Sequence, residues 1–168
     1  EMCIRDRWET GLRVESGLTA LNSYENRVYQ FSDDDKRRYV AKFYRPQRWS
    51  QGQIEEEHQF ASELFADEIP IAAPLELNGS MLHQHQGFWY AVFPSLGGRQ
   101  YETDNYDHLE WVGRFLGRIH QVGRRKLFSQ RPTIGLQEYI EEPLQIFADS
   151  TLVPVSYTHL RAHETRGN

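Results

Sequence analysis

The sequence has almost no cysteine and no long apolar run. Cys3 is the one cysteine, so a disulfide framework within the chain is excluded. No apolar stretch approaches the roughly 18 residues that a membrane-spanning helix requires, and no signal peptide is visible. We therefore expect a cytoplasmic protein without a membrane partner.

Positive charge is also scarce. The 168 residues include 19 lysines and arginines against 24 aspartates and glutamates, which gives a formal net charge of −5. Domains that bind nucleic acid usually carry a basic patch, and none is visible here. We expect no nucleic-acid partner. The length and the mixture of strand and helix patterns predict about one domain of the α+β class.

The sequence lacks the commonest marks of a catalytic centre. No cluster of His, Cys, Asp and Glu has the spacing of metal ligands, and no arrangement of Ser, His and Asp has motif-level support. The glycine-rich phosphate loop G-x-G-x-x-G is absent as well. No single short motif therefore identifies a function.

Both ends of the chain resemble translated sequencing adapters. Residues 1–7 (EMCIRDR) correspond to the common transposase adapter, and residues 155–165 (VSYTHLRAHET) correspond to its reverse complement continued into an index adapter. Such segments must be excluded from fold reasoning. We predict that residues 1–7 and 155–168 are artefacts and that residues 8–154 are a fragment of a longer protein.

The most informative stretch is residues 39–44 (YVAKFY), an aromatic and β-branched run that contains one lysine. It follows the alternating residues 27–31, so the two runs predict a β-hairpin. Because strand side chains alternate, Val40 and Lys42 share a face. This face suits a site in which Val40 packs on adenine and Lys42 reaches phosphate. The alternative is an edge-strand lysine that extends to solvent.

A helix is predicted for residues 53–66. Ser50 is its expected N-cap, and Gln53 completes a capping box. Among three consecutive glutamates only Glu57 begins an apolar stripe, at i+3, i+4 and i+7. A carboxylate that faces a core needs a cationic partner, and Lys42 on the preceding strand provides one. The alternative is a solvated charge on the flank of the helix.

Two further segments carry groups that could contact a nucleotide. Asn22 and Ser23 lie in a turn-rich loop, where backbone N–H groups and the Ser23 hydroxyl can face an anion. The apolar residues 88–93 predict a central strand that ends at Pro94. The Pro94 carbonyl can accept a hydrogen bond from an adenine amino group, and the Leu96 N–H can donate to a ring nitrogen. The alternatives are an ordinary hairpin entry and a plain interdomain linker.

Flanking elements complete the prediction. We expect a short strand at residues 12–14, a two-residue turn at residues 78–79, and a helix over residues 104–123 in which Gly123 is the C′ residue, just outside the last helical turn. A further helical stretch over residues 137–149 should be interrupted at Pro143.

Five stretches form a specific set: residues 22–31 (NSYENRVYQF), 40–46 (VAKFYRP), 56–61 (EEHQFA), 92–100 (VFPSLGGRQ) and 131–136 (RPTIGL). Together they resemble the bacterial stress-response kinases of the aminoglycoside-phosphotransferase/choline-kinase superfamily. The likeness spans nearly all of residues 8–154.

The resemblance implies a protein-kinase-like N-terminal lobe (8–94), a hinge (95–100) and the start of a helical C-terminal lobe (101–154). It implies an ATP- and Mg²⁺-dependent kinase, a cytoplasmic monomer that phosphorylates Ser or Thr of a protein substrate during envelope and oxidative stress. Ser23 matches the loop that contacts ATP, and Lys42 and Glu57 match the phosphate-binding pair. Pro94 and Leu96 match the hinge that binds adenine.

One departure from the family is an absence. The catalytic loop H-G-D-x-H-x-x-N does not occur in this sequence. The general base and the Mg²⁺ ligands would follow Pro154, so we predict neither catalytic nor metal-binding residues in the fragment and no activity of its own.

Three alternatives stay open. One is a small-molecule kinase of the same fold that acts on an amino alcohol, homoserine or a sugar, because the N-terminal lobe binds ATP and not the acceptor. Another is a nucleotide-binding pseudokinase, which the downstream catalytic loop would distinguish. The last is an unrelated α+β binding domain, in which Lys42 would have no effect on nucleotide binding.

Overall fold

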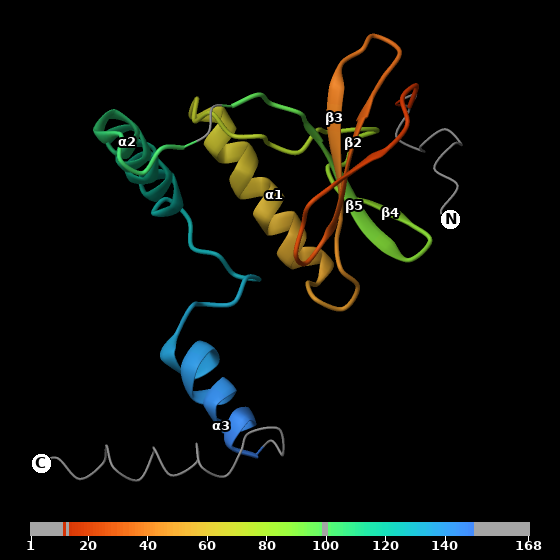
Figure 1. Cartoon of the computed structure of the whole chain (residues 1–168). Coiled ribbons are helices and arrows are strands. Elements are labelled where there is room, and N and C mark those ends of the chain that lie inside the picture. Colours follow the sequence, from red (N-terminus) through yellow and green to blue (C-terminus); the bar gives the residue numbers. More distant parts are fainter. Residues whose placement is uncertain (1–11, 13, 99–100, 150–168) are drawn as a thin grey trace, which may run out of the picture. The chain divides into compact units, whose positions relative to one another are not determined.

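The computed structural model describes residues 12, 14–98 and 101–149 (Figure 1). Both predicted adapter segments therefore lie outside the described residues. The chain divides into two compact units, Glu1–Arg131 and Pro132–Asn168. The first contains the sheet and two helices, and the second contains a short helical segment.

The first unit is built on one antiparallel five-stranded sheet with the strand order β1-β2-β3-β5-β4. The strands are β1 (Thr19–Leu21), β2 (Arg27–Ser32), β3 (Arg38–Phe43), β4 (His83–His85) and β5 (Phe88–Pro94). The predicted hairpin is β2–β3, and the predicted apolar strand is β5, which lies inside the sheet. The α+β class is confirmed.

The strand expected at residues 12–14 is wrong. Leu12 and Val14 are outside any strand, and the edge strand beside β2 is β1, whose Thr19 pairs with Gln30. Leu12 and Val14 instead pack against the core under the sheet. Their apolar character thus reflects side-chain packing, whereas all three residues of β1 are exposed and are held by backbone pairing.

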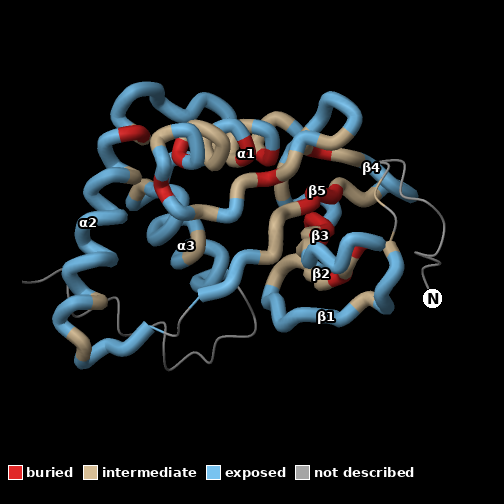
Figure 2. The backbone as a smooth tube through the Cα atoms, turned by 90° about the horizontal axis from the view of Figure 1, so that it is seen from above, coloured by how far each residue is buried: buried red, intermediate tan, exposed pale blue. Residues whose placement is uncertain are grey.

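The two faces of the sheet bury different clusters, which Figure 2 shows as the buried parts of the strands and of helix α1 (Gln51–Ala66). One face contributes Phe31, Ala41, Phe43, Tyr90 and Val92. The other contributes Tyr44 and Ala91, which pack with Ile54 of α1. Lys42 lies opposite Ala91 in the register, so it shares the face that α1 covers.

Helix α1 begins as its sequence predicts. The Ser50 hydroxyl accepts a hydrogen bond from the Gln53 N–H at 3.3 Å, and the Gln53 side chain accepts one from the Ser50 N–H at 2.9 Å. This is the predicted capping box, although the helix already starts at Gln51.

Helix α2 (Tyr106–Gly123) agrees with the predicted helix except at its ends. Asn105 is the N-cap, and Gly123 is the last helical residue, with Arg124 as the C-cap, so the prediction that Gly123 terminates the helix from outside is wrong. Val122 packs with Leu64 of α1 in a small core cluster. This contact ties α2 to α1.

The second unit contains a π-helical turn, η1 (Gln137–Glu141), followed directly by α3 (Glu142–Asp149). The helix is therefore not interrupted at Pro143, and the irregular turn lies before it, at Gln137–Glu141. Pro143 occupies the first turn of α3, where its missing N–H costs little, and the turn before it widens. None of the helices in the described chain is both long and apolar enough to cross a membrane.

Candidate nucleotide site

Strand β3 and helix α1 bring together the predicted lysine and glutamate. Lys42 Nζ lies 3.1 Å from Glu57 Oε1. The two side chains are 26% and 35% exposed, so the pair is accessible to a ligand while being partly removed from water. Helical spacing thus identified the correct partner among three glutamates.

A neutral aromatic layer lies behind Lys42. Its ammonium group is 4.5 Å from the centre of the Tyr44 ring, and the Tyr44 hydroxyl is 2.7 Å from Nε2 of His58. Burial raises the pKa of Tyr44, and burial lowers the pKa of His58 to about 4. Both groups are therefore uncharged near neutral pH. His58 therefore adds no positive charge beside Lys42.

A second cation contacts the same glutamate. Arg131 NH1 lies 3.1 Å from Glu57 Oε2, and the Arg131 guanidinium carbon is 4.2 Å from the centre of the Trp49 ring. The sequence did not reveal this role, because Arg131 is far from Glu57 along the chain and no local periodicity connects them. Its position in one of the five matching stretches was the available signal.

Glu56, the neighbour of Glu57, binds the segment that carries Arg131. Its Oε1 accepts hydrogen bonds from the N–H and the hydroxyl of Ser129, at 2.6 and 3.1 Å. Its Oε2 accepts from the N–H groups of Gln130 and Arg131, at 2.9 and 2.8 Å. Burial would raise the pKa of Glu56, but these hydrogen bonds lower it to about 2. The helical pattern gave no indication of this role.

The loop between β1 and β2 lies at the end of β3 that leads to α1. Asn26 Oδ1 accepts a hydrogen bond from the Arg45 N–H at 3.2 Å, and Glu25 forms an ion pair with Arg48 at 2.7 Å. The predicted ligand residues Asn22 and Ser23 are exposed. The loop is therefore anchored on one side and presents polar groups on the other.

The predicted hinge continues β5 and is still bonded to β3 at its start. Pro94 pairs with Tyr39, and the Ser95 N–H donates to the Arg38 carbonyl at 3.0 Å. Leu96 is 59% exposed. Val40 pairs with Phe93, just before this hinge.

Val40 and Lys42 therefore lie on one face of β3 in the order that a nucleotide requires. Alternate residues on a strand are about 7 Å apart. Val40 is the nearer of the two to the hinge, and Lys42 is the nearer to the loop after β1. An adenine beside Val40 would thus direct its phosphates toward Lys42. The residues present fit ATP.

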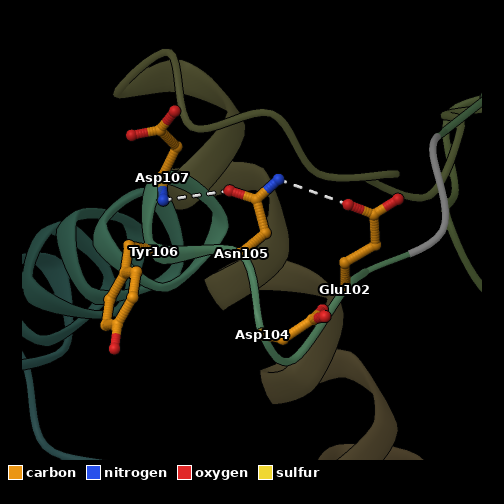
Figure 3. Close-up of a pocket in the computed structure, with 5 residues that line it drawn as sticks. All are labelled: Glu102, Asp104, Asn105, Tyr106 and Asp107. Atoms are coloured by element: carbon orange, nitrogen blue, oxygen red, sulfur yellow. Dashed lines mark hydrogen bonds between the residues drawn. The ribbon is translucent and has the colours of Figure 1, made fainter.

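A separate hollow of about 450 Å³ lies at the start of α2 and is lined by Glu102, Asp104, Asn105, Tyr106 and Asp107 (Figure 3). Asn105 accepts from the N–H of Asp107 at 3.1 Å and donates to Glu102 at 3.2 Å, as the dashed lines show. The bond from the Asp107 N–H is that of a helix N-cap. The carboxylates that line the hollow would repel phosphates, so this hollow does not compete with the Lys42 face as a nucleotide site.

Among the described residues, no group of three or more His, Cys, Asp or Glu could hold a metal ion.

The sequence of the chain matches a known protein family over most of its length. Residues 17–154 match the model of the phosphotransferase enzyme family (APH). The chain belongs to this family. Its fold is thereby assigned to the phosphotransferases that resemble protein kinases.

Two curated relatives are close in sequence. Stress response kinase A of Escherichia coli (strain K12) is 64% identical over 147 residues, and the serine/threonine protein kinase RdoA of Salmonella typhimurium (strain LT2) is 63% identical over the same number. Each alignment covers 88% of this chain and 45% of the relative. The chain therefore spans slightly less than half the length of these relatives.

Solved structures share the fold at lower identity. The amicoumacin kinase hAmiN in complex with AMP-PNP, Ca²⁺ and Ami gives a TM-score of 0.64 at 22% identity, covering 90% of this chain and 49% of that one. A microcompartment-associated aminopropanol kinase gives a TM-score of 0.66 at 18% identity, with 88% and 49% covered. Both similarities show the fold alone.

Proposed function

We propose that the longer protein represented by this segment is an ATP- and Mg²⁺-dependent kinase that phosphorylates Ser or Thr of a protein substrate in the bacterial stress response. One observation carries the nucleotide part of the proposal. The Lys42–Glu57 ion pair forms at 3.1 Å on the sheet face that also carries Val40, beside the hinge at Pro94. Lysine–glutamate pairs of this kind hold the phosphates of ATP in protein kinases.

Each of the predicted site residues then has one role in binding ATP. Val40 packs on the adenine ring, while the Pro94 carbonyl accepts a hydrogen bond from it and the Leu96 N–H donates one. Lys42 attracts the phosphates, and Glu57 keeps the ammonium group of Lys42 in place. The loop at Asn22 and Ser23 covers the phosphates with N–H and hydroxyl donors. Bound ATP and Mg²⁺ supply the phosphoryl group and neutralise its charge during transfer.

We further infer that this segment binds nucleotide without transferring a phosphoryl group. The general base and metal ligands of the family lie in the motif H-G-D-x-H-x-x-N and after it, and the 168 residues do not contain that motif. The lobe boundaries proposed for the longer protein are residues 8–94, 95–100 and 101–154, with residues 1–7 and 155–168 as adapter sequence.

The relatives favour a protein substrate over a small molecule. The names of relatives at 63–64% identity are those of stress-response and Ser/Thr protein kinases, whereas the small-molecule kinases are 18–22% identical. A small-molecule acceptor, such as an amino alcohol, homoserine or a sugar, is the second candidate because the solved structures that share the fold include such enzymes. We propose a cytoplasmic monomer that binds neither nucleic acid nor membrane.

The test uses the full-length protein with Lys42→Ala. Losing a charge-assisted contact to phosphate should weaken ATP binding about ten- to a hundredfold and leave adenosine binding unchanged. Lys126→Ala removes an exposed lysine after α2 and is the matched control. Calorimetric titration gives both affinities, and radiolabelled ATP reports transfer to a generic Ser/Thr protein or to an amino alcohol. Unchanged ATP affinity and unchanged transfer in Lys42→Ala would refute the site.

A further inference from the structure

Two neighbouring glutamates of α1 act on one segment in different ways. Glu56 accepts four hydrogen bonds from residues 129–131, three of them from backbone N–H groups. Glu57 contacts the side chain of Arg131 and also Lys42. The backbone of Arg131 is thus bound by one carboxylate and its side chain by the next.

Arg131 is held at three points. Its N–H donates to Glu56, its NH1 lies against Glu57, and its guanidinium carbon is 4.2 Å from the centre of the Trp49 ring. The side chain is 27% exposed, and its NH1 atom is buried and meets Glu57 as an ion pair without hydrogen-bond geometry. Because the Arg131 side chain is already fixed in this way, its ion pair with Glu57 costs little further rotamer freedom.

Sharing one carboxylate between two cations constrains its orientation. Glu57 uses Oε1 for Lys42 and Oε2 for Arg131, each at 3.1 Å. A partly exposed ion pair alone is weak, because water competes for both charges. With Oε2 engaged, rotation of the carboxylate away from Lys42 would break a second ion pair.

We propose that Arg131 is a positioning residue of the nucleotide site, and that Glu56 places it there. Arg131 acts through Glu57, which it keeps directed at Lys42 before any nucleotide arrives. This inference rests on the proposed function, because it assigns a role within the same ATP site. It adds that the Lys42–Glu57 pair is preformed, whereas many kinases assemble such a pair by moving the helix.

The experiment is a double-mutant cycle in the full-length protein. Arg131→Ala should weaken ATP binding about fivefold and leave adenosine binding unchanged, which also shows that the variant is folded. In the Glu57→Gln background, Arg131→Ala should have no further effect, because its route to Lys42 is already lost. Arg131→Lys should recover part of the affinity, since it restores a charge near Glu57 without the planar contact to Trp49.

The outcomes separate the inference from the proposed function. If Lys42→Ala weakens ATP binding and Arg131→Ala does not, Arg131 has no positioning role. If Arg131→Ala still weakens ATP binding in the Glu57→Gln background, Arg131 contacts the phosphates directly, and the positioning role is refuted. If the wild-type protein does not bind ATP, the proposed function itself fails.

Hydrogen exchange tests the contribution of Glu56 without nucleotide. Glu56→Gln should speed exchange at the amides of residues 129–131 about tenfold, because a charged acceptor of three N–H groups is replaced. It should also reproduce part of the loss in ATP affinity seen with Arg131→Ala. Glu55→Gln, at the exposed neighbouring position, is the matched control. Faster exchange with unchanged ATP affinity would overturn the claim that Glu56 places Arg131.

Discussion

At the scale of single residues, His58 links the core to the candidate nucleotide site. It is 1% exposed, its Nε2 lies 2.7 Å from the Tyr44 hydroxyl, and its ring meets Phe93 edge-on at 6.1 Å. Its neighbour Glu57 would raise its pKa, but burial has the larger effect and lowers the pKa to about 4. The protein therefore buries His58 as a neutral group.

Protonation of His58 should destabilise the protein in mild acid. The pKa is lowered from 6.5 to about 4 on folding, so the unfolded chain binds the proton first. The stability due to neutral His58 is complete above pH 6.5 and falls as the pH drops toward 4. The loss between pH 6.5 and 4.5 should be roughly 1–2 kcal/mol once solvent screening is allowed for.

Urea unfolding at several pH values measures this effect. His58→Gln should remove the pH dependence in that interval, while His85→Gln, at an exposed position of β4, should retain it. The interval lies above the ordinary pKa of 4.5 for the Glu56 carboxyl, whose folded pKa of about 2 affects stability only at lower pH. An unchanged pH dependence in His58→Gln would contradict the assignment.

The site residues that the sequence could predict are those with local signatures. Lys42 stands out because a strand alternates with period two, and Glu57 stands out because an apolar stripe follows it with helical period. Arg131 and Glu56 have no such signature, since their partners are set by the path of the chain after α2. Long-range contacts of this kind need a three-dimensional structure.

At the scale of elements, α1 is fastened at both ends. Near its start the Gln53 side chain donates to the Gln130 carbonyl at 3.0 Å. After its end Asp67 accepts from Arg125 at 2.8 Å, and the Asp67 carbonyl accepts from Arg118 at 2.6 Å. The hydrogen bond from Arg125 lowers the pKa of Asp67. These contacts resist movement of the helix that carries Glu57.

The capping box of α1 should be measurable as stability. Ser50→Ala removes the acceptor for the Gln53 N–H and should lower the free energy of unfolding by about 1 kcal/mol. Ser50→Asp keeps an acceptor and adds a charge that the helix N-terminus favours, so it should stay close to wild type. Linear extrapolation of urea unfolding compares the two. A loss in Ser50→Asp as large as in Ser50→Ala would show that the cap is not the cause.

Elements with strong local patterns were predictable, and those held by pairing alone were not. Strand β5 and helix α1 follow from an apolar run and a capping box. Strand β1 is short and fully exposed, so no burial pattern marks it. The π-helical turn before α3 also depends on backbone geometry that residue types do not specify.

At the scale of the whole molecule, helix α2 is exposed along most of its length, as its colouring in Figure 2 shows. Its exposed apolar side chains include Leu109 (46%), Trp111 (54%), Val112 (41%), Phe115 (38%) and Leu116 (50%). Three of them, Val112, Phe115 and Leu116, belong to one helical stripe. Apolar stripes of this kind normally pack against another element. Because the curated relatives are more than twice as long as the aligned part, we expect further chain to cover this stripe in the longer protein.

The isolated 168-residue chain should therefore bind the dye ANS and self-associate. Full-length protein should bind much less dye, because the same stripe is then removed from water. In the isolated chain, Val112→Lys with Leu116→Lys should reduce ANS fluorescence and shift sedimentation toward monomer. Gln121→Lys, at an exposed polar position of α2, controls for added charge alone and should change neither. Equal ANS binding by the isolated chain and the full-length protein would mean that the stripe is not covered, and the stripe would then have to be explained as a surface for a separate partner.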